Sequence, residues 1–161
     1  MPELIFLETV NTSLCASCGF CCNNLPGLTI PSDWGRDDDE IRANITAALA
    51  SGDYCVDRWE GDPRYDDYHT EGYLPSVEMV RPRLRDYKNR IEHYPWFERG
   101  PCLLLTPTGC SLPLERRPYE CRSLMPKPNR QCYQLGMKKQ EIAITWVPFV
   151  DMIDSILKTL A

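Results

Sequence analysis

Nine cysteines constrain this 161-residue chain more than any other feature, because eight of them form an upstream and a downstream set of four. The upstream set is compact and comprises Cys15, Cys18, Cys21 and Cys22. The downstream set is spread out and comprises Cys102, Cys110, Cys121 and Cys132. Whether such cysteines bind metal or form disulfides depends on the redox compartment in which the protein works.

The sequence predicts a cytoplasmic protein. Its first residues, MPELIFLETVN, carry two glutamates around a short apolar run and no basic residue ahead of that run, unlike an export signal. No stretch approaches the roughly 20 apolar residues that cross a bilayer, so we expect no membrane partner. Thiols stay reduced in the cytosol, and we therefore expect metal ligands, with a disulfide framework as the alternative.

The upstream spacing favours an iron-sulfur cluster. Cys15, Cys18 and Cys21 form a C-x2-C-x2-C run, the spacing by which ferredoxin loops wrap a [4Fe-4S] cluster whose fourth ligand is distant in sequence. Four upstream and four downstream thiols suffice for two tetrathiolate sites. Adjacent side chains such as those of Cys21 and Cys22 normally diverge, so we expect them to serve different centres. This predicts two clusters with an electron-transfer or partner-supporting role.

Zinc is the competing metal, because it also accepts four thiolates in a closed tetrahedral site. Structural zinc sites usually combine two CxxC-like pairs, and the downstream cysteines are too widely spaced to form the second pair. A structural zinc module for interaction with another protein remains the alternative function. Cys55 is expected in the core, and His69 and His93 are expected in structural or surface positions.

Two motifs resemble the YkgJ-type cysteine-cluster family, whose CxxCxxCC domain is described as zinc- or iron-chelating. They are CASCGFCC at residues 15–22 and PCLLLTPTGCSLPLERRPYECR at residues 101–122. The resemblance implies metal chelation by the cysteines of both motifs, with Cys132 as an addition. A related domain occurs in flagellin lysine N-methylases, so a cluster-dependent enzyme that modifies proteins or peptides is a further alternative. The SLMPKPNRQC segment departs from the commoner form, in which an aromatic-proline pair follows RPxxCR.

Within RPYECR, Pro118 is expected to begin a short helix that presents Cys121. Arg117 and Arg122 would then flank its thiolate. Guanidinium groups stabilise an anionic metal centre and raise the potential of a redox cluster, so both arginines are predicted to support the cofactor.

The remaining pattern predicts one helix-rich α+β domain over residues 1–161, with short strands and irregular cysteine-bearing loops around metal centres. One helix is expected from Ser32, as its cap, to about Ser51, with Gly52 as its stop. An apolar stripe from Trp146 to Leu160 predicts a C-terminal helix with Pro148 in its first turn. Short strands are expected at Tyr54–Trp59, Ser76–Val80 and Pro101–Leu105, with a turn at Thr108-Gly109 after the last.

The net charge and the motifs of the chain limit the classes of partner and activity that we expect. A formal charge of −5 argues against nucleic acid, whose binding depends on Lys and Arg. The basic run that begins at Arg81 and Arg83 is expected to form a solvated face. We expect a protein partner. A homodimer that forms through the C-terminal helix is the alternative. The chain has no G-x-G-x-x-G, P-loop or HExxH motif, so no catalytic residues are assigned.

Overall fold

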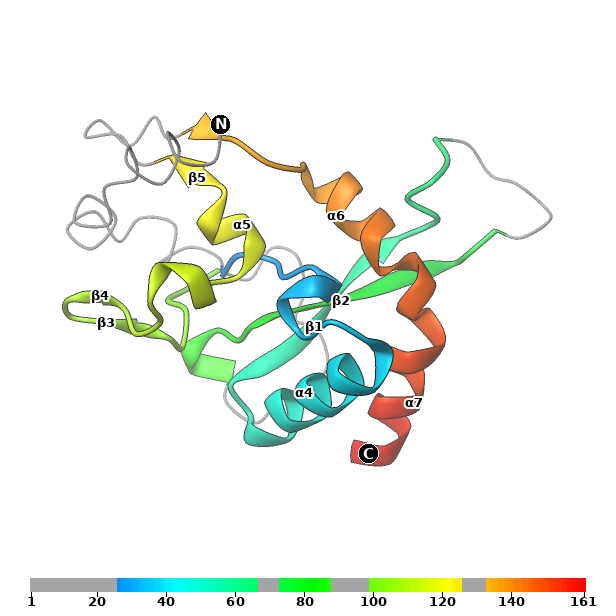
Figure 1. The fold of residues 1–161 in the computed structure, drawn as a ribbon, viewed down its shortest axis with the longest axis horizontal. Coiled ribbons are helices and arrows are strands. Elements are labelled where there is room, and N and C mark those ends of the chain that lie inside the picture. The colour runs from blue at the N-terminus through cyan, green and yellow to red at the C-terminus, as the bar shows by residue number, and fades with distance from the viewer. Residues whose placement is uncertain (1–25, 67–72, 88–98, 126–132) are drawn as a thin grey trace.

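The computed structural model describes residues 26–66, 73–87, 99–125 and 133–161 (Figure 1). These residues form an α+β structure in which short helices surround small antiparallel sheets. The strands are β1 (Tyr54–Glu60), β2 (Ser76–Pro82), β3 (Leu105–Thr106), β4 (Gly109–Cys110), β5 (Leu124–Met125) and β6 (Tyr133–Gln134). The α-helices are α4 (Asp38–Ser51), α5 (Tyr119–Arg122), α6 (Lys139–Trp146) and α7 (Val150–Leu160). The 3-10 turns are η1 (Pro31–Asp33), η2 (Arg85–Tyr87), η3 (Leu114–Arg116) and η4 (Val147–Phe149).

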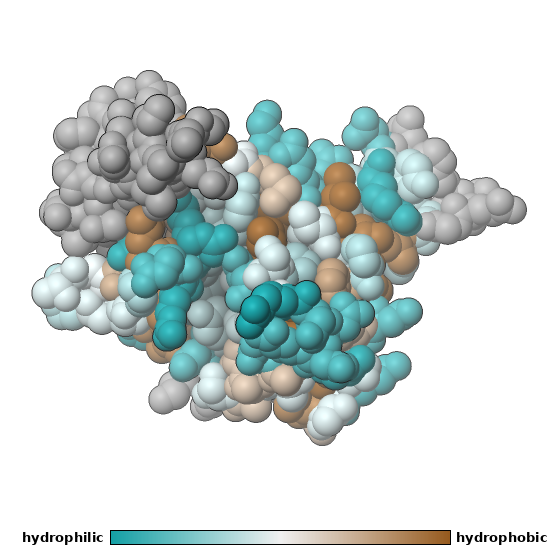
Figure 2. Space-filling view, in the orientation of Figure 1, coloured by the Kyte–Doolittle hydropathy of each residue, from teal (hydrophilic) through white to brown (hydrophobic). Residues whose placement is uncertain are grey.

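Helix α4 confirms the first predicted helix but begins later. Asp37 caps it, because its side chain accepts a 2.8 Å hydrogen bond from the Glu40 amide. The predicted cap, Ser32, lies instead in η1. The helix ends as expected at Gly52, whose φ of 85° suits a residue without a Cβ. Hydrophilic residues cover the outer face of its first turns (Figure 2).

Strands β1 and β2 form an antiparallel hairpin that confirms the first two predicted strands. Its register runs from Tyr54 opposite Pro82 to Glu60 opposite Ser76. The third predicted strand, Pro101–Leu105, is wrong over most of its length: β3 spans Leu105–Thr106, and Cys102 makes only an isolated bridge with Leu84. The predicted turn joins β3 to β4.

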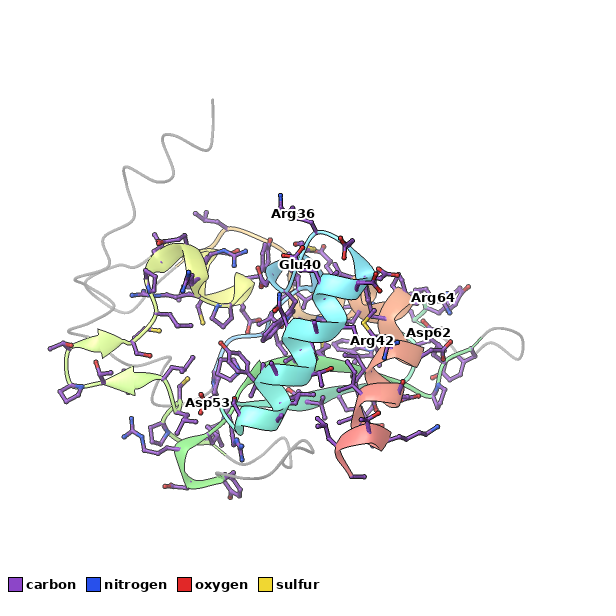
Figure 3. The ribbon with its side chains drawn as sticks, turned by 60° about the horizontal axis from the view of Figure 1, so that its bottom comes forward. Arg36, Glu40, Arg42, Asp53, Asp62 and Arg64 are labelled. Atoms are coloured by element: carbon purple, nitrogen blue, oxygen red, sulfur yellow. The ribbon has the colours of Figure 1, made fainter. Side chains whose placement is uncertain are left out.

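The principal core lies between the β1–β2 hairpin and three helices. Helix α4 contacts β1 and α7, while α6 and α7 contact β2. The buried members of this core are Leu28, Ile41, Ile45, Leu49, Val56, Val77, Met79, Val80, Ile142, Ala143, Trp146, Ile153 and Ile156. Arg42 on α4 also donates a 3.3 Å hydrogen bond to Ser155 on α7, and Figure 3 shows the two helices side by side.

The C-terminal apolar stripe belongs to two helices rather than one. Trp146 ends α6, which was not predicted, and η4 separates it from α7. Pro148 lies within η4, where it has no N–H to continue the α-helical ladder. Ile153 and Ile156 on α7 are buried in the core, which confirms the packing role of that stripe. A homodimer surface on this helix stays a prediction.

The basic run that the sequence predicts as a solvated face is only partly exposed. Arg85 is exposed, but Arg81 on β2 and Arg83 just after it are only 2% and 0% exposed. Lys88 and Arg90 lie outside the described residues. Arg81 Nη1 lies 3.2 Å from Asp57 Oδ2, and Arg83 Nη1 donates a 2.6 Å hydrogen bond to the Tyr87 carbonyl. Arg81 and Arg83 therefore bind other residues inside the protein instead of facing solvent.

None of the helices in the described ranges combines the length and the apolarity that a bilayer crossing needs.

Candidate functional site

The structure describes three of the eight predicted metal ligands: Cys102, Cys110 and Cys121. The other five lie outside the described residues: Cys15, Cys18, Cys21, Cys22 and Cys132. His69 and His93 also lie outside them. Cys55 is fully buried beside Leu84, which confirms its predicted core position.

Backbone hydrogen bonds fix Cys102 against the end of the central hairpin. The Leu103 amide donates to the Arg83 carbonyl at 2.8 Å, and the Arg85 amide donates to the Pro101 carbonyl at 2.8 Å. These bonds flank the bridge between Leu84 and Cys102. Cys102 is 7% exposed and is thereby held beside the carboxyl end of β2.

A small hairpin folds Cys110 back toward Cys102. Cys110 lies opposite Leu105 in the β3–β4 pair, and the Leu105 amide donates to the Cys102 carbonyl at 3.1 Å. Gly109 permits the turn because its φ is 112°, a value that other residues rarely adopt. Thr106 Oγ1 donates a 2.6 Å hydrogen bond to the Gly109 carbonyl and closes the hairpin.

Cys121 is presented by α5, the short helix that the sequence predicts. Pro118 occupies the N-cap, and its carbonyl accepts a 2.9 Å hydrogen bond from the Cys121 amide. The Cys121 side chain is half-buried. The following strand, β5, pairs with β6 and aligns Met125 with Tyr133.

Tyr54, at the start of β1, is half-buried and has a perturbed hydroxyl. Burial raises its pKa to about 12, with smaller contributions from Cys102, Cys110, Asp53 and Cys121. The ring also packs edge-on against Trp34, with centroids 5.1 Å apart. We call Cys102, Cys110 and Cys121 the downstream cysteine group.

The downstream cysteine group does not form a closed metal site by itself. Within the described part of the chain, no three His, Cys, Asp or Glu side chains are close enough together to hold a metal ion. Its donor chemistry nonetheless suits a metal that prefers sulfur, such as zinc or the iron of a cluster. A tetrathiolate site here would need further thiols from outside the described residues.

Gly27 brings a second segment directly against the group. A Cβ built on Gly27 would collide with Cys121 Sγ and would lie 3.1 Å from the Cys121 amide nitrogen. The neighbouring Leu28 exchanges two bonds with Glu120: its amide donates to Glu120 Oε1 at 3.1 Å, and its carbonyl accepts from the Glu120 amide at 3.0 Å. The segment that follows the upstream motif therefore packs on the helix that carries Cys121.

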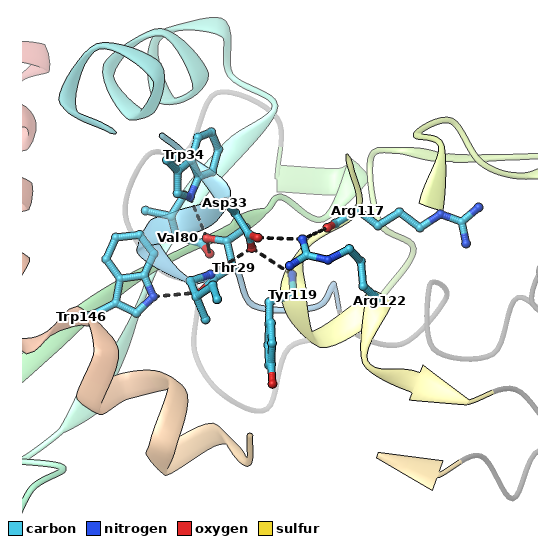
Figure 4. A network of polar contacts seen from close by, with 9 residues as sticks. Thr29, Asp33, Trp34, Val80, Arg117, Tyr119, Arg122 and Trp146 are labelled. Atoms are coloured by element: carbon cyan, nitrogen blue, oxygen red, sulfur yellow. Dashed lines mark hydrogen bonds and ion pairs between the residues drawn. The ribbon is translucent and has the colours of Figure 1, made fainter. Parts of the chain in front are cut away.

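The predicted flanking of the Cys121 thiolate by Arg117 and Arg122 stays a prediction, but the structure shows contacts of both arginines that the sequence did not reveal. Arg122 Nη1 lies 2.6 Å from Asp33 Oδ1 and donates to the Arg117 carbonyl at 2.7 Å (Figure 4). The Arg122 guanidinium also lies 5.8 Å from the centroid of the Tyr119 ring, within cation–π range. Arg117 Nε donates to the Leu112 carbonyl at 3.1 Å. Stabilisation of a cofactor by these arginines stays a prediction.

A cleft of about 800 Å³ is lined by residues that include Ser32 and Asp33 of η1, Glu115 and Arg116 of η3, and Tyr54. Solvent can therefore reach Tyr54.

Sequence reasoning missed Tyr54, Gly27 and Asp33. The Pro-Gly pair at residues 26–27 is a turn signal that could have marked a close backbone approach. Nothing in the sequence pattern singles out Tyr54 or Asp33, because their roles depend on residues that are distant along the chain.

Comparison with protein-family models, with curated proteins and with solved structures gives no significant match to this chain. The similarity to the YkgJ-type family rests on the cysteine pattern, and membership stays a prediction.

Proposed function

We propose that this protein binds metal through cysteine thiolates and holds iron-sulfur clusters, in keeping with its resemblance to the YkgJ-type family. The proposed ligands are Cys15, Cys18, Cys21, Cys22, Cys102, Cys110, Cys121 and Cys132. Two tetrathiolate sites account for all eight. The proposed role is electron transfer or support of a protein partner, carried out by the loops around these centres.

One observation carries the proposal: backbone contacts bring together cysteine-bearing segments that are distant in sequence. The β3–β4 hairpin folds Cys110 back toward Cys102, and Gly27, which follows the upstream motif, lies against Cys121 Sγ. Thiols brought together in a reducing compartment are more often metal ligands than structural residues.

Chain connectivity supports a contribution from the upstream motif. Five peptide units join Cys22 to Gly27, so covalent geometry keeps their Cα atoms within about 18 Å. Gly27 itself contacts Cys121. Cys132 is likewise bonded to Tyr133, which pairs with Met125 four residues after Cys121. These limits allow the remaining thiols to reach the downstream group.

Metal analysis after anaerobic purification tests this function. We expect iron and acid-labile sulfide in similar amounts and broad visible absorption. A colourless protein with stoichiometric zinc would instead favour the structural zinc module. A folded protein that contains neither metal and binds neither when reconstituted would contradict the proposal.

Single cysteine variants test the ligand set. We expect Cys121→Ala to lose metal, whereas Cys55→Ala, which changes a core residue outside the set, should retain it. Single Ser variants of all eight ligands should divide into two groups, according to which centre is lost. One undivided group would contradict the two-centre arrangement.

A further inference from the structure

Residues 27–34 form a strap between the core and the downstream cysteine group. Thr29 anchors the strap on the core side and is 3% exposed. Its amide and its Oγ1 both donate to the Val80 carbonyl, at 3.0 and 2.7 Å. Trp146 Nε1 donates to the Thr29 carbonyl at 2.8 Å (Figure 4). The core therefore fixes the position of this part of the strap.

Asp33 anchors the other side of the strap, and its carboxylate has three partners. Oδ1 accepts from Arg122 Nη1 at 2.6 Å, and Oδ2 accepts from the Tyr119 amide at 3.0 Å. Oδ2 also accepts from the Ile30 amide at 3.1 Å, within the strap itself. Both contacts outside the strap fall on α5, at residues that flank Cys121.

The Asp33–Arg122 ion pair is better shielded than a surface pair. The side chains are 11% and 29% exposed, and the N–O distance of 2.6 Å is that of a charge-assisted hydrogen bond. Arg122 Nη1 also donates to the Arg117 carbonyl. One guanidinium at the end of α5 therefore binds both the strap and the residue that precedes the N-cap of α5. This geometry restricts how α5 can rotate, and rotation of α5 would move Cys121 Sγ away from Gly27.

We propose that Asp33 is a positioning residue of the metal centre: through Arg122 and Tyr119 it orients α5 so that Cys121 presents its sulfur toward the strap. The inference rests on the proposed metal-binding function and deepens it. Asp33 acts on the proposed centre indirectly, since its carboxylate oxygens accept hydrogen bonds from nitrogen donors of Ile30, Tyr119 and Arg122. Its effect on the metal is exerted through the ligand that it orients.

Replacement of Asp33 by Asn provides the test, because the amide oxygen can still accept hydrogen bonds while the charge is lost. Apo-protein prepared anaerobically is titrated with Co²⁺, whose ligand-field bands report the geometry of thiolate coordination. We expect Asp33→Asn to bind Co²⁺ roughly 10- to 100-fold more weakly, the usual effect of losing an outer-shell partner. At saturating Co²⁺ its bands should also differ from those of the wild type.

Glu78→Gln is the matched control. It removes the charge from the 3.1 Å pair with Arg58, on the β1–β2 hairpin and away from the downstream cysteine group. We expect its Co²⁺ affinity and bands to match those of the wild type. Arg122→Lys, which keeps the charge, should bind Co²⁺ more tightly than Arg122→Gln, and this pair provides the test if Asp33→Asn does not fold.

The outcomes separate the two proposals. If the wild type binds Co²⁺ through thiolates and both Asp33→Asn and Arg122→Gln match it in affinity and bands, the positioning role is wrong and metal binding stands. An Asp33→Asn protein that unfolds more easily but has unchanged Co²⁺ bands and affinity also contradicts positioning. A wild type that binds no Co²⁺, and carries no metal when purified, overturns both.

Discussion

Gly27 and Cys121 lie so close together that the space for a Cβ on Gly27 is already filled by the Cys121 sulfur. The contact joins residues on opposite sides of the central hairpin in sequence, and it places backbone where a side chain would collide with the Cys121 sulfur. Gly27 does not have a left-handed φ. A glycine is needed here because Cys121 approaches its backbone so closely.

Gly27→Ala should therefore displace either the strap or α5. We expect a loss of about 1–3 kcal/mol in the free energy of unfolding, the usual cost of overpacking, together with reduced metal content. Urea denaturation and metal analysis measure the two effects. Gly100→Ala is the control, since the nearest atom to its new Cβ would be Leu84 Cδ2 at 4.0 Å. Equal behaviour of the two variants would contradict the close-contact explanation.

Helix α6 offers a matched pair for the core. Ile142 is 0% exposed and Ile144, two residues later, is 41% exposed. Ile142→Ala should lower the free energy of unfolding by about 2–5 kcal/mol, because it leaves a cavity. Ile144→Ala should change it by about 0.5 kcal/mol or less. Similar losses in chemical denaturation would show that α6 does not pack through the face described here.

Asp62 is expected to contribute to the pH dependence of the unfolding free energy in acid. Arg64 donates to both of its carboxylate oxygens, at 3.0 and 2.7 Å, and Figure 3 shows the two side chains together at the end of the hairpin. The hydrogen bonds from Arg64 hold the pKa of Asp62 well below its ordinary value of 3.8. Because the folded-state pKa is the lower one, this stabilisation is present above pH 3.8 and is lost as the pH falls toward the folded-state pKa.

Asp62→Asn should accordingly flatten the dependence of unfolding free energy on pH below 3.8. The measurement is urea denaturation over an acid pH series, compared by slope rather than by absolute stability. Asp66→Asn, at an exposed carboxylate nearby, serves as the control. If the unfolding free energy of the wild type and of Asp62→Asn fell with the same slope as the pH is lowered below 3.8, the Arg64 contact would not shift the pKa of Asp62.

Removal of metal should destabilise the protein, if the proposed function holds. Ligation that occurs only in the folded state adds its binding free energy to folding. For a chain of this size each kcal/mol is worth roughly 2–4 °C in melting temperature. Thermal unfolding of metal-loaded and chelator-treated protein, monitored by far-UV circular dichroism, measures the difference. Identical melting curves would contradict the expected coupling.

The sequence by itself determined the elements whose causes are local. Helix α4 follows from apolar spacing and from Gly52, and its acidic first turn suits the helix dipole. Strands β1 and β2 follow from β-branched and aromatic residues between turn signals, and α5 follows from Pro118. The cysteine spacing likewise identified the ligand candidates, because cluster-binding loops use a restricted set of spacings.

Only the tertiary structure decided which of these features meet. The burial of Arg81 and Arg83 depends on parts of the chain that pack on the end of β2 and on the residues after it, so their charge alone suggested the wrong environment. The division of the C-terminal stripe at Pro148 depends on whether an α-helical or a 3-10 bond is made there. The link from Asp33 to Arg122 spans 89 residues. Periodicity and capping act within a few residues, whereas such contacts arise only when separate elements pack on a common core.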